Sequence, residues 1–593
     1  MQKAEVLEKV FGFNVFRSFQ EEAVDAILAG RDLLMILPTG GGKSLCYQLP
    51  SLLMEGVTVV ISPLIALMQD QVRGLNENGI RAATINSDMD DEARAEVFAA
   101  LKRGEIKLLY VAPERLGAGG FVPFLQSLDI NFFVIDEAHC VSEWGHEFRA
   151  DYRKLDLLKE AFPQTPVAAF TATATPKVEA DIIAALRLED PLRLRAKVFR
   201  SNLTIRTQKR VSNGRTQLLN FLDRHSGESG IIYAFTRKET EQLADFLQSR
   251  GISARAYHAR LPIEEKSQVM KDFMYDKIDI VVATIAFGMG IDKSNIRFVV
   301  HTSLPKTIEN YYQEIGRAGR DGLQSETLLL YTKGDEIQKR ELIDGALTDA
   351  YKEVLYGKLQ SMYRFALSSA CKHRMLGTYF GDESEDCGDK CDSCLRGEVA
   401  QIDITREAQM FLSAIYRTGE RFGQNHIIDI LRGSHAANIT KFGHDKLSVY
   451  GIGETRNKNE WGMIADRLFE LGAVGLGEYR ALKLQQEAKA ILKGEREVRI
   501  DEDKLGTVRR IRKAEEVIEK DERFEAFRAL RLQIATEHEV PAYMVFSDKT
   551  LHELSSRLPQ NREEMLEISG IGDVKFDRYG EAFLTLCREL ARQ

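Results

Sequence analysis

The segment from Leu37 to Ser44, LPTGGGKS, has residue types suited to binding the phosphates of a nucleotide. It follows an apolar run and precedes a stretch with helical character, so glycine N–H groups and a helix N-terminus would meet anionic oxygens. Lys43 would then reach the terminal phosphates and Ser44 would offer its hydroxyl to Mg²⁺. Leu37 stands where the general motif has glycine, and a plain glycine-rich turn is the alternative. The candidate phosphate-binding residues are Thr39, Gly40, Gly41, Gly42, Lys43 and Ser44.

Two acids, Asp136 and Glu137, follow an apolar run about ninety residues later. A carboxylate at a strand end can hold hydrated Mg²⁺, and its neighbour can orient and deprotonate the attacking water. We therefore expect Asp136 at the metal and Glu137 as general base. A helix N-cap with acidic first-turn residues would explain one acid but not the pairing with a phosphate loop.

Gln20 lies upstream of the glycine-rich loop, with Phe16 and Arg17 just before it. A glutamine amide can both donate to and accept from the edge of adenine, which points to ATP. Phe16 or Arg17 would stack on the adenine ring. The alternative is a helix N-terminus with a glutamine on the surface.

Arg317 and Arg320 lie in the segment QEIGRAGRDG, at the end of a second set of apolar runs that has no phosphate loop of its own. Residues three apart share one face of a helical turn, and the planar guanidinium suits phosphate. If two sheets face each other, both arginines would reach the γ-phosphate. The alternative is an exposed basic turn.

Short apolar runs separated by helix-length segments must position these groups, and this pattern predicts an α/β fold with parallel sheets. Polar residues follow the runs directly, as expected where ligands bind at the carboxyl ends of strands. The predicted strands are 33–37, 57–61, 108–111, 132–135, 167–170, 230–235, 278–283 and 298–301.

Four of the seven cysteines fall between positions 371 and 394, in a pattern that predicts a structural metal site. Four thiolates suit tetrahedral Zn²⁺ and leave no open position for catalysis. Free cysteines are the alternative. The expected ligands are Cys371, Cys387, Cys391 and Cys394.

An aromatic segment, 142–152, follows the two acids and contains one of the two tryptophans. Aromatic rings with an interleaved arginine suit stacking on bases and contact with phosphates of a single strand. An aromatic core cluster under the sheet is the alternative. The candidate DNA-binding residues are Trp144, His146, Phe148 and Arg149.

Composition sets wider limits. The chain has 593 residues and a formal net charge of −8, so any nucleic-acid groove must be locally basic. No apolar run is long enough for a membrane span, and the first ten residues lack a signal-peptide core, so we expect a cytoplasmic, nucleoid-associated protein without a membrane partner. In the C-terminal half, helical patterns and a glycine-rich turn at 475–480 suggest a winged helix, which could bind duplex DNA or another protein. If it binds DNA, the candidate phosphate contacts are Lys441, His444, Lys446 and Arg456.

The ordered motifs PTGGGKS, SPLIALMQDQ, APERL, DEAHC, TATAT, TIAFGMGIDK and QEIGRAGRDG resemble those of the RecQ family of DNA helicases. In that resemblance Arg17 and Gln20 match the adenine motif, and Arg317 and Arg320 match the arginine fingers. The segment His258–Leu261 reads HARL where the family has a HAGL-like sequence. Gly570 and Gly572 resemble a phosphate-binding hairpin loop, with an interhelical turn as the alternative.

The resemblance implies an α/β protein with two RecA-like P-loop domains, a zinc-binding helical subdomain, a winged helix and a small all-α HRDC domain. It also implies 3′–5′ unwinding of duplex DNA with translocation on single-stranded DNA, using ATP, Mg²⁺ and Zn²⁺, in recombination and repair. Single-strand DNA-binding protein and other repair proteins are expected partners, and an RNA-remodelling ATPase is the alternative. The expected domains span 1–200, 201–335, 336–400, 401–500, a charged linker at 501–523, and 524–593.

Overall fold

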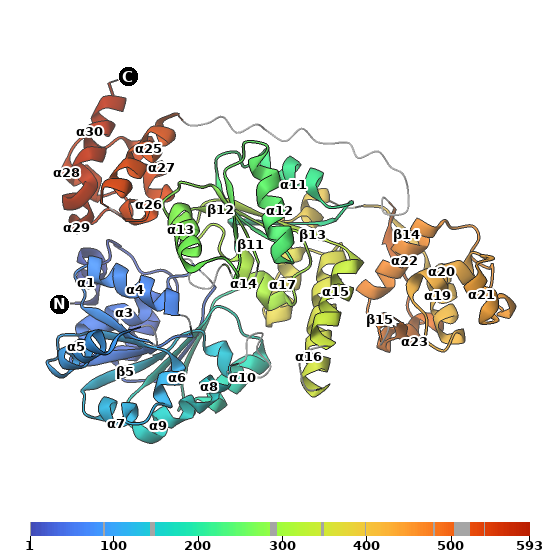
Figure 1. The fold of residues 1–593 in the computed structure, drawn as a ribbon, viewed down its shortest axis with the longest axis horizontal. Helices are drawn as coiled ribbons and strands as arrows, with labels where there is room; N and C mark the ends of the chain where they lie inside the picture. Colours follow the sequence, from blue (N-terminus) through green and yellow to red (C-terminus); the bar gives the residue numbers. More distant parts are fainter. Residues whose placement is uncertain are drawn as a thin grey trace.

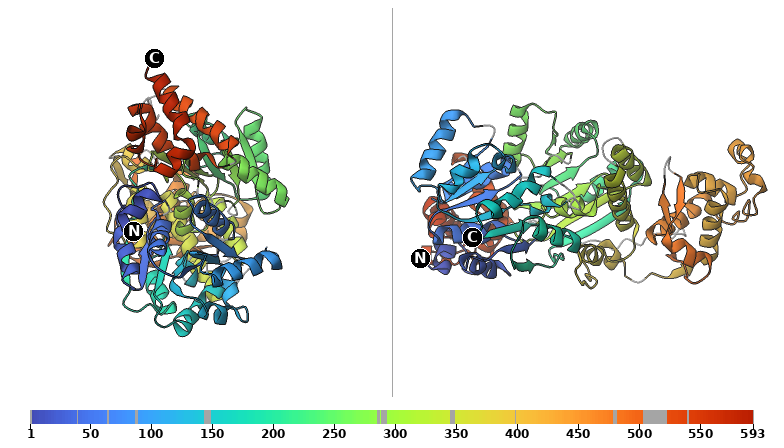
Figure 2. Two further views of the ribbon diagram at one scale, coloured as in Figure 1. Left: turned by 90° about the vertical axis from the view of Figure 1, so that its left-hand side faces the viewer. Right: turned by 90° about the horizontal axis from the view of Figure 1, so that it is seen from below.

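The computed structural model describes most of the chain as five packed units (Figure 1). Two α/β lobes lie at the centre and at one end, a helix-and-wing domain forms the other end, and a C-terminal helical bundle sits beside the two lobes (Figures 1 and 2). The described residues are all those of the chain except 1, 39, 64, 87–88, 143–148, 285–286, 288–292, 345–348, 398, 478–480, 503–521, 539 and 593.

Lobe 1 is built on a parallel seven-stranded sheet in the order β3-β4-β2-β5-β6-β1-β7. Leu34 and Ile36 face one hydrophobic cluster while Leu33 and Met35 face another, so both faces of the sheet are covered. This explains the continuous apolar runs of its strands. The strands are β1 (Leu33–Ile36), β2 (Val57–Ile61), β3 (Ala82–Ile85), β4 (Leu108–Val111), β5 (Ile130–Ile135), β6 (Val167–Thr171) and β7 (Leu192–Arg195).

Helices cover both faces of this sheet (Figure 1). They are α1 (Lys3–Lys9), α2 (Gln20–Leu28), α3 (Lys43–Leu53), α4 (Ile65–Glu77), α5 (Asp91–Lys102), α6 (Pro113–Leu116), α7 (Phe121–Gln126), η1 (Ala138–Val141), α8 (Ala150–Arg153), η2 (Lys154–Asp156), α9 (Leu157–Ala161) and α10 (Pro176–Ala185).

Lobe 2 repeats this plan with a parallel six-stranded sheet in the order β10-β11-β9-β12-β13-β8. Its strands are β8 (Leu203–Lys209), β9 (Ser229–Tyr233), β10 (Ala254–Tyr257), β11 (Ile280–Ala283), β12 (Ile296–His301) and β13 (Ser325–Tyr331). Its helices are α11 (Arg215–Leu222), α12 (Arg237–Gln248), α13 (Ile263–Met274) and α14 (Ile308–Ile315).

A helical subdomain with the four clustered cysteines follows, made of α15 (Lys333–Asp344), α16 (Asp349–Leu367), α17 (Lys372–Phe380) and α18 (Asp392–Arg396). The next domain combines helices with two small antiparallel sheets. Its elements are β14 (Gln401–Asp403), α19 (Thr405–Arg417), α20 (Gln424–Leu431), α21 (Ala437–Lys441), η3 (His444–Lys446), α22 (Lys458–Glu470), β15 (Val474–Leu476), β16 (Leu482–Leu484), α23 (Gln486–Leu492) and β17 (Arg499–Asp501).

The C-terminal bundle, residues 522–592, is entirely helical where it is described and has its own hydrophobic core. Its elements are α25 (Glu522–Glu537), α26 (Ala542–Val545), α27 (Asp548–Arg557), α28 (Arg562–Leu566), α29 (Asp573–Lys575), η5 (Phe576–Gly580) and α30 (Glu581–Leu590). The predicted fold class and order of units are therefore confirmed.

Two of the predicted phosphate contacts in the helix-and-wing domain already have partners within that domain. Arg456 forms ion pairs with Glu407 at 2.8 Å and Glu460 at 3.3 Å. His444 is buried, and its Nδ1 is 2.8 Å from Nε2 of His426. Lys441 and Lys446 are exposed.

The predicted charged linker is also too long at its start. Asp501 belongs to β17, is 5% exposed and pairs with Arg396 at 2.6 Å. At the other end, Glu522 already begins α25. Most of the intervening segment lies outside the described residues.

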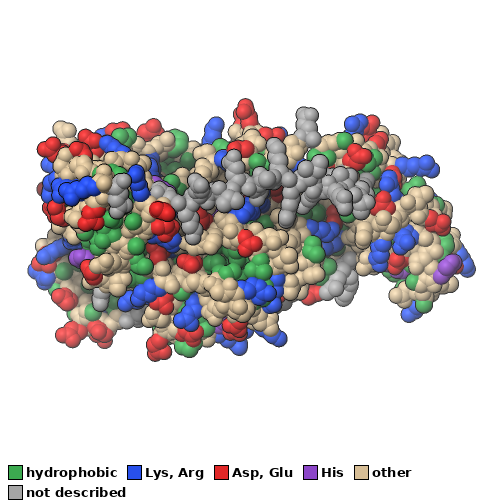
Figure 3. Space-filling view, turned by 90° about the horizontal axis from the view of Figure 1, so that it is seen from above, with side chains coloured by type: hydrophobic (Ala, Val, Ile, Leu, Met, Phe, Trp, Pro, Cys, Tyr) green, Lys and Arg blue, Asp and Glu red, His purple; other side chains and the backbone are tan. Residues whose placement is uncertain are grey.

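The surface seen from above interleaves basic and acidic side chains without a large area of one sign (Figure 3). In the described part of the chain, none of the helices combines the length and apolar character that a membrane crossing needs.

Gly230 in β9 shows how tightly the sheet of lobe 2 is packed. A Cβ atom at this position would lie 2.0 Å from Cε2 of Phe298, a fully buried ring on the neighbouring strand β12. Real Cβ atoms do not approach ring carbons this closely, so any side chain here must displace the ring. The glycine is therefore required by packing and not by backbone conformation.

We expect Gly230→Ala to lower the free energy of unfolding of lobe 2 by about 1–3 kcal/mol, the usual cost of overpacking a core. Gly74→Ala is the matched control, because a Cβ there meets nothing within 4 Å and the position is in helix α4. Calorimetric unfolding measures both variants. An unchanged transition in Gly230→Ala would contradict the packing argument.

Candidate functional site

The phosphate loop of lobe 1 joins β1 to α3, as the sequence predicts. Gly42 adopts a left-handed backbone, φ 81°, as the residue that precedes the helix. Lys43 Nζ donates to the carbonyl oxygen of Leu37 at 3.0 Å, across the base of the loop. Leu37 is buried, and a Cβ at Gly41 would lie 2.5 Å from its Cγ, so the leucine side chain packs directly against the backbone of the loop. Thr39 lies outside the described residues.

Gln20 is tied to this loop rather than exposed. Its Oε1 accepts the backbone N–H of Arg17 at 2.8 Å, and its Nε2 donates to the carbonyl of Gly42 at 3.2 Å. Arg17 Nη1 donates to the carbonyl of Gly40 at 3.0 Å. Phe16 packs against the apolar cluster between the N-terminal helices. Gln20 and Arg17 thus lie beside the loop, whereas the ring of Phe16 is already used in packing.

Asp136 and Glu137 directly follow β5 on the same edge of the sheet as the phosphate loop. Asp136 is held by its N–H donating to Ile61 at 2.9 Å and by its carbonyl accepting from Tyr152 at 3.0 Å. Glu137 has a left-handed backbone, φ 49°. That conformation is strained for a residue with a side chain and is typical of functional sites.

A histidine that the sequence analysis did not assign connects these acids to the next strand. His139 is buried, and its Nδ1 is 3.2 Å from Glu137 Oε2 and 3.0 Å from Thr171 Oγ1. Thr171 ends β6 and also donates to the carbonyl of Thr173 at 3.1 Å. The motifs DEAH and TAT are therefore in contact. Both motifs directly follow apolar runs of the sequence, and this shared position at strand ends could have predicted the contact.

The two acids suit a divalent cation. Burial and the neighbouring charge of Glu137 raise the pKa of Asp136 to about 7, while Lys43 acts in the opposite direction. A buried carboxylate pair of this kind is stabilised by a cation with oxygen ligands, such as Mg²⁺. Ser44, in the first turn of α3, adds a hydroxyl of the kind that such a cation takes.

Arg320 of lobe 2 reaches across to the phosphate loop of lobe 1. A Cβ at Gly40 would lie 3.0 Å from Cγ of Arg320, so the arginine stem rests on the glycine backbone. Burial lowers the pKa of Lys43, Glu137 and Asp136 oppose this effect, and the charge of Arg320 adds to it. Arg317 is buried instead inside lobe 2, beside the hydroxyl of Tyr233. The two arginines therefore occupy different places.

Of the candidate DNA-binding residues, Trp144, His146 and Phe148 lie outside the described residues. Arg149 is described: its Nη1 donates to the carbonyl of Pro63 at 3.0 Å. Pro63 follows strand β2, so Arg149 links the segment after the acids to another strand end of the same sheet edge.

The four cysteines converge as predicted from their spacing. The sulfur atoms of Cys371, Cys387, Cys391 and Cys394 all lie within 4.8 Å of one another. Cys371 Sγ accepts the N–H groups of Arg374 at 3.5 Å and of Cys387 at 3.3 Å, and Cys391 Sγ accepts that of Cys394 at 3.4 Å. Backbone donors aimed at sulfur suit thiolates bound to one Zn²⁺.

Removing the proton from Cys387 is costly without a cation. Burial raises the pKa of the Cys387 thiol to about 12, and hydrogen bonds with the neighbouring thiols of Cys371 and Cys394 add to the increase. A bound Zn²⁺ would stabilise all four thiolates. The cluster is also fixed to lobe 2, because the N–H of Ile205 on β8 donates to the carbonyl of Lys390 at 2.9 Å.

We expect Cys391→Ser to lower the zinc content from about one ion per chain to nearly none, because three thiolates leave the tetrahedral shell open. Cys587→Ser is the control, since that buried cysteine lies in the C-terminal bundle. Plasma mass spectrometry of the purified proteins measures the metal. Equal zinc in both variants would contradict the assignment of Cys391.

Five family descriptions match successive parts of this chain. They are the DEAD/DEAH box helicase over residues 17–182, the helicase conserved C-terminal domain over 214–322, RecQ zinc-binding over 333–395, the RQC domain over 398–507 and the HRDC domain over 520–587.

Curated relatives match over nearly the full length. A protein of Haemophilus influenzae named ATP-dependent DNA helicase RecQ is 40% identical over 592 residues, which cover 98% of this chain and 95% of the relative. A protein of Bacillus subtilis with the same name is 40% identical over 595 residues, which cover 99% and 98%. These matches, together with the cysteine cluster and the two facing lobes, show that the chain belongs to the RecQ helicase family.

Proposed function

We propose that this protein is an ATP-dependent DNA helicase that moves 3′ to 5′ along single-stranded DNA and unwinds duplexes. The observation that carries the proposal is the contact of Arg320 from lobe 2 with Gly40 of the lobe 1 phosphate loop. A nucleotide in that loop would be enclosed by groups from both lobes. Binding, hydrolysis and release would then close and open the space between the lobes, which is the motion a translocating motor needs.

Within this site each described residue has a distinct task. Glu137 takes the proton of the attacking water, and its contact with His139 fixes its orientation. Lys43 and Arg320 stabilise the charge that develops on the transferred phosphoryl group. When bound, Mg²⁺ would neutralise phosphate oxygens, with Ser44 and Asp136 as its protein partners. Gln20 would read adenine after its present hydrogen bonds rearrange.

Arg317 has a supporting task in this scheme. It is 5% exposed and lies beside Tyr233, whose hydroxyl donates to the carbonyl of Phe287 at 3.1 Å. Arg320 is therefore the arginine that touches the loop, and Arg317 would approach the phosphates only if lobe 2 moved further inward.

DNA would bind along the strand ends of both lobes. On lobe 2 a surface hollow is lined by Arg237, Lys238 and Arg260, together with Glu241, whose carboxylate is 2.9 Å from Nε2 of buried His258. Three cations in one hollow suit backbone phosphates, so the arginine of the HARL segment adds a positive charge where the related family has glycine. On lobe 1 the candidate single-strand contacts remain Trp144, His146, Phe148 and Arg149, which couple DNA to hydrolysis through the adjacent acids.

Duplex DNA would meet the helix-and-wing domain, where Lys441 and Lys446 are the exposed candidates. A helicase acting on DNA would work in the cytoplasm at the nucleoid, in recombination and repair. Single-strand DNA-binding protein and other repair proteins are the partners we propose for it. Both relatives named above are called ATP-dependent DNA helicases, which supports the action on DNA.

We expect Glu137→Gln to bind ATP but to lower kcat for ATP hydrolysis at least a hundredfold, because loss of a general base typically costs that much. A fluorescent ATP analogue measures binding, and phosphate release measures turnover. Glu160→Gln is the control, since this exposed carboxylate of lobe 1 pairs only with Arg187 among the described contacts. Retained hydrolysis in Glu137→Gln would overturn the assignment of the base.

Strand displacement tests the activity itself. We expect ATP-dependent unwinding of forked and 3′-tailed DNA duplexes, with little unwinding of 5′-tailed duplexes. RNA duplexes with the same tails serve as the comparison, and DNA rather than RNA should stimulate ATP hydrolysis. Preference for RNA would favour the RNA-remodelling alternative, and preference for a 5′ tail would reverse the proposed direction.

A further inference from the structure

The C-terminal bundle, residues 522–592, places a fully buried arginine against lobe 2. Arg531 on α25 is 0% exposed. Its Nη1 donates to Asp548 Oδ1 at 2.8 Å and to the carbonyl of Phe546 at 2.9 Å, both within the bundle. Its Nη2 lies 3.4 Å from Asp276 Oδ2 of lobe 2. A buried guanidinium needs acidic partners, and one of these partners belongs to another domain.

Asp276 completes a group of four buried charges at this contact. It occupies a left-handed turn, φ 57°, between α13 and β11, and its Oδ1 pairs with Lys293, which is 0% exposed. Burial alone would raise the pKa of Asp276, but Lys293 and Arg531 outweigh it and lower the value to about 2. Two cations and two anions, Lys293, Arg531, Asp276 and Asp548, therefore balance at the boundary of two domains.

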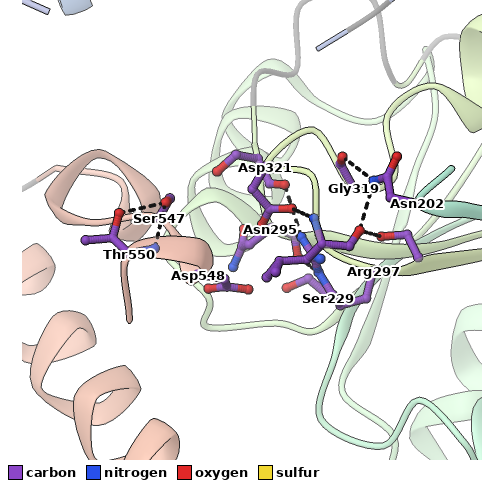
Figure 4. Close-up of polar contacts among 12 residues, drawn as sticks. Asn202, Ser229, Asn295, Arg297, Gly319, Asp321, Ser547, Asp548 and Thr550 are labelled. Atoms are coloured by element: carbon purple, nitrogen blue, oxygen red, sulfur yellow. Dashed lines mark hydrogen bonds and ion pairs between the residues drawn. The ribbon is translucent and has the colours of Figure 1, made fainter. Parts of the chain in front are cut away.

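This charge group adjoins the segment that holds the arginine loop of the nucleotide site (Figure 4). Asn295 Nδ2 is 3.4 Å from Asp276 Oδ1, and two residues later Arg297 Nη2 donates to Asp321 Oδ2 at 2.5 Å. Asp321 directly follows Arg320. The N–H of Gly319 donates to the carbonyl of Ile296 at 2.8 Å, which fixes the other side of the same loop. The docked bundle is thus connected, through Asp276 and Asn295, to the residues that position Arg320.

The bundle also touches lobe 1, at the hairpin loop that carries Gly570 and Gly572. A Cβ at Gly572 would lie 3.3 Å from Cα of Gly12, next to helix α1. Lys575 is near Glu77 at the end of α4: burial lowers the pKa of Lys575 to about 8, and the charge of Glu77 opposes that effect. The loop predicted as a phosphate site or an interhelical turn is here packed against lobe 1.

We propose that the C-terminal bundle is a clamp that bridges the two lobes and favours the arrangement in which Arg320 lies on the phosphate loop. One contact is on lobe 1 and the other is on lobe 2, so both are made together only while the lobes keep this relative position (Figure 1). A change in lobe position breaks at least one contact, and the second is then held less strongly because the bundle loses its bivalent attachment.

The clamp and the nucleotide would then act on each other. A ligand that closes the lobes strengthens docking of the bundle, and docking strengthens ligand binding by the same factor. The docking itself stands on the contacts above, whereas its coupling to ATP rests on the proposed function. Opening of the lobes after hydrolysis would release the bundle, whose hairpin loop and α25 surface would then be exposed.

Two charge-reversal variants each alter one of the two contacts of the bundle. Arg528→Glu places a carboxylate near Asp276 and Asp279 of lobe 2, whose charges Arg528 now complements. Lys575→Glu faces Glu77 of lobe 1 with a like charge. Neither residue belongs to the nucleotide site. Arg592→Glu is the control with the same charge change, because it follows the end of α30 that points away from the lobes (Figure 1).

Hydrogen–deuterium exchange of the full-length protein measures docking without reference to activity. We expect both reversals to speed exchange at residues 8–13 and at 274–279, while exchange at 583–587, inside the bundle, stays slow. Arg592→Glu should match the unaltered protein, and Glu77→Lys combined with Lys575→Glu should restore protection. A non-hydrolysable ATP analogue should slow exchange at both segments and bind the two reversals about two- to fivefold more weakly, the scale of one exposed charge pair.

Unchanged exchange at both segments in both reversals would overturn the clamp. Release of only the altered contact, with full protection kept at the other, would also overturn it, because losing one contact of a bivalent clamp weakens the other. Altered exchange without any effect of the analogue would leave the docking in place and count against its coupling to the nucleotide. Failure of the analogue to bind the unaltered protein would instead contradict the proposed function.

Discussion

Arg320 rests its side-chain stem on the backbone of Gly40, and the architecture of the protein depends on this approach between two lobes. A Cβ at Gly40 would lie 3.0 Å from Cγ of Arg320, closer than ordinary van der Waals contact, and the φ of 83° at this residue already favours glycine. Arg320 can therefore contact the phosphate loop only because Gly40 has no side chain. Two parallel sheets, each with its functional residues at the carboxyl ends of strands, bring the partners to this place.

The residues around the acids show a second constraint, which is internal to lobe 1. Glu137 holds a left-handed backbone while its carboxylate meets His139, and His139 in turn meets Thr171 on the adjacent strand. The strain at Glu137 is thus offset by contacts from a neighbouring strand end. A shift of β6 relative to β5 would change the contacts of the Glu137 carboxylate. The proposed base can therefore respond to movement of the segment after β6.

Much of the fold follows from local sequence, because continuous apolar runs leave few choices for buried parallel strands. β2 and β4 match the predicted ranges, and the phosphate loop and cysteine cluster form where glycine and cysteine spacing require them. Contacts between distant segments were harder to predict. Arg456 and His444 pair with Glu407 and His426, which come from other helices, and no local pattern marks such pairs. The buried pairing of Arg531 with Asp276 likewise joins residues 255 positions apart.

The cysteine subdomain has a consequence for the sheet of lobe 2. Strand β8 is the outermost strand of that sheet, so one side of its backbone has no neighbouring strand. The subdomain occupies this side: Lys390 accepts the N–H of Ile205, Cys391 forms a β-bridge with Ile205, and Asp392 accepts the N–H of Thr207 at 2.7 Å. The cysteine subdomain therefore also shields an open sheet edge, and displacement of the subdomain would expose a surface on which other chains can pair and aggregate.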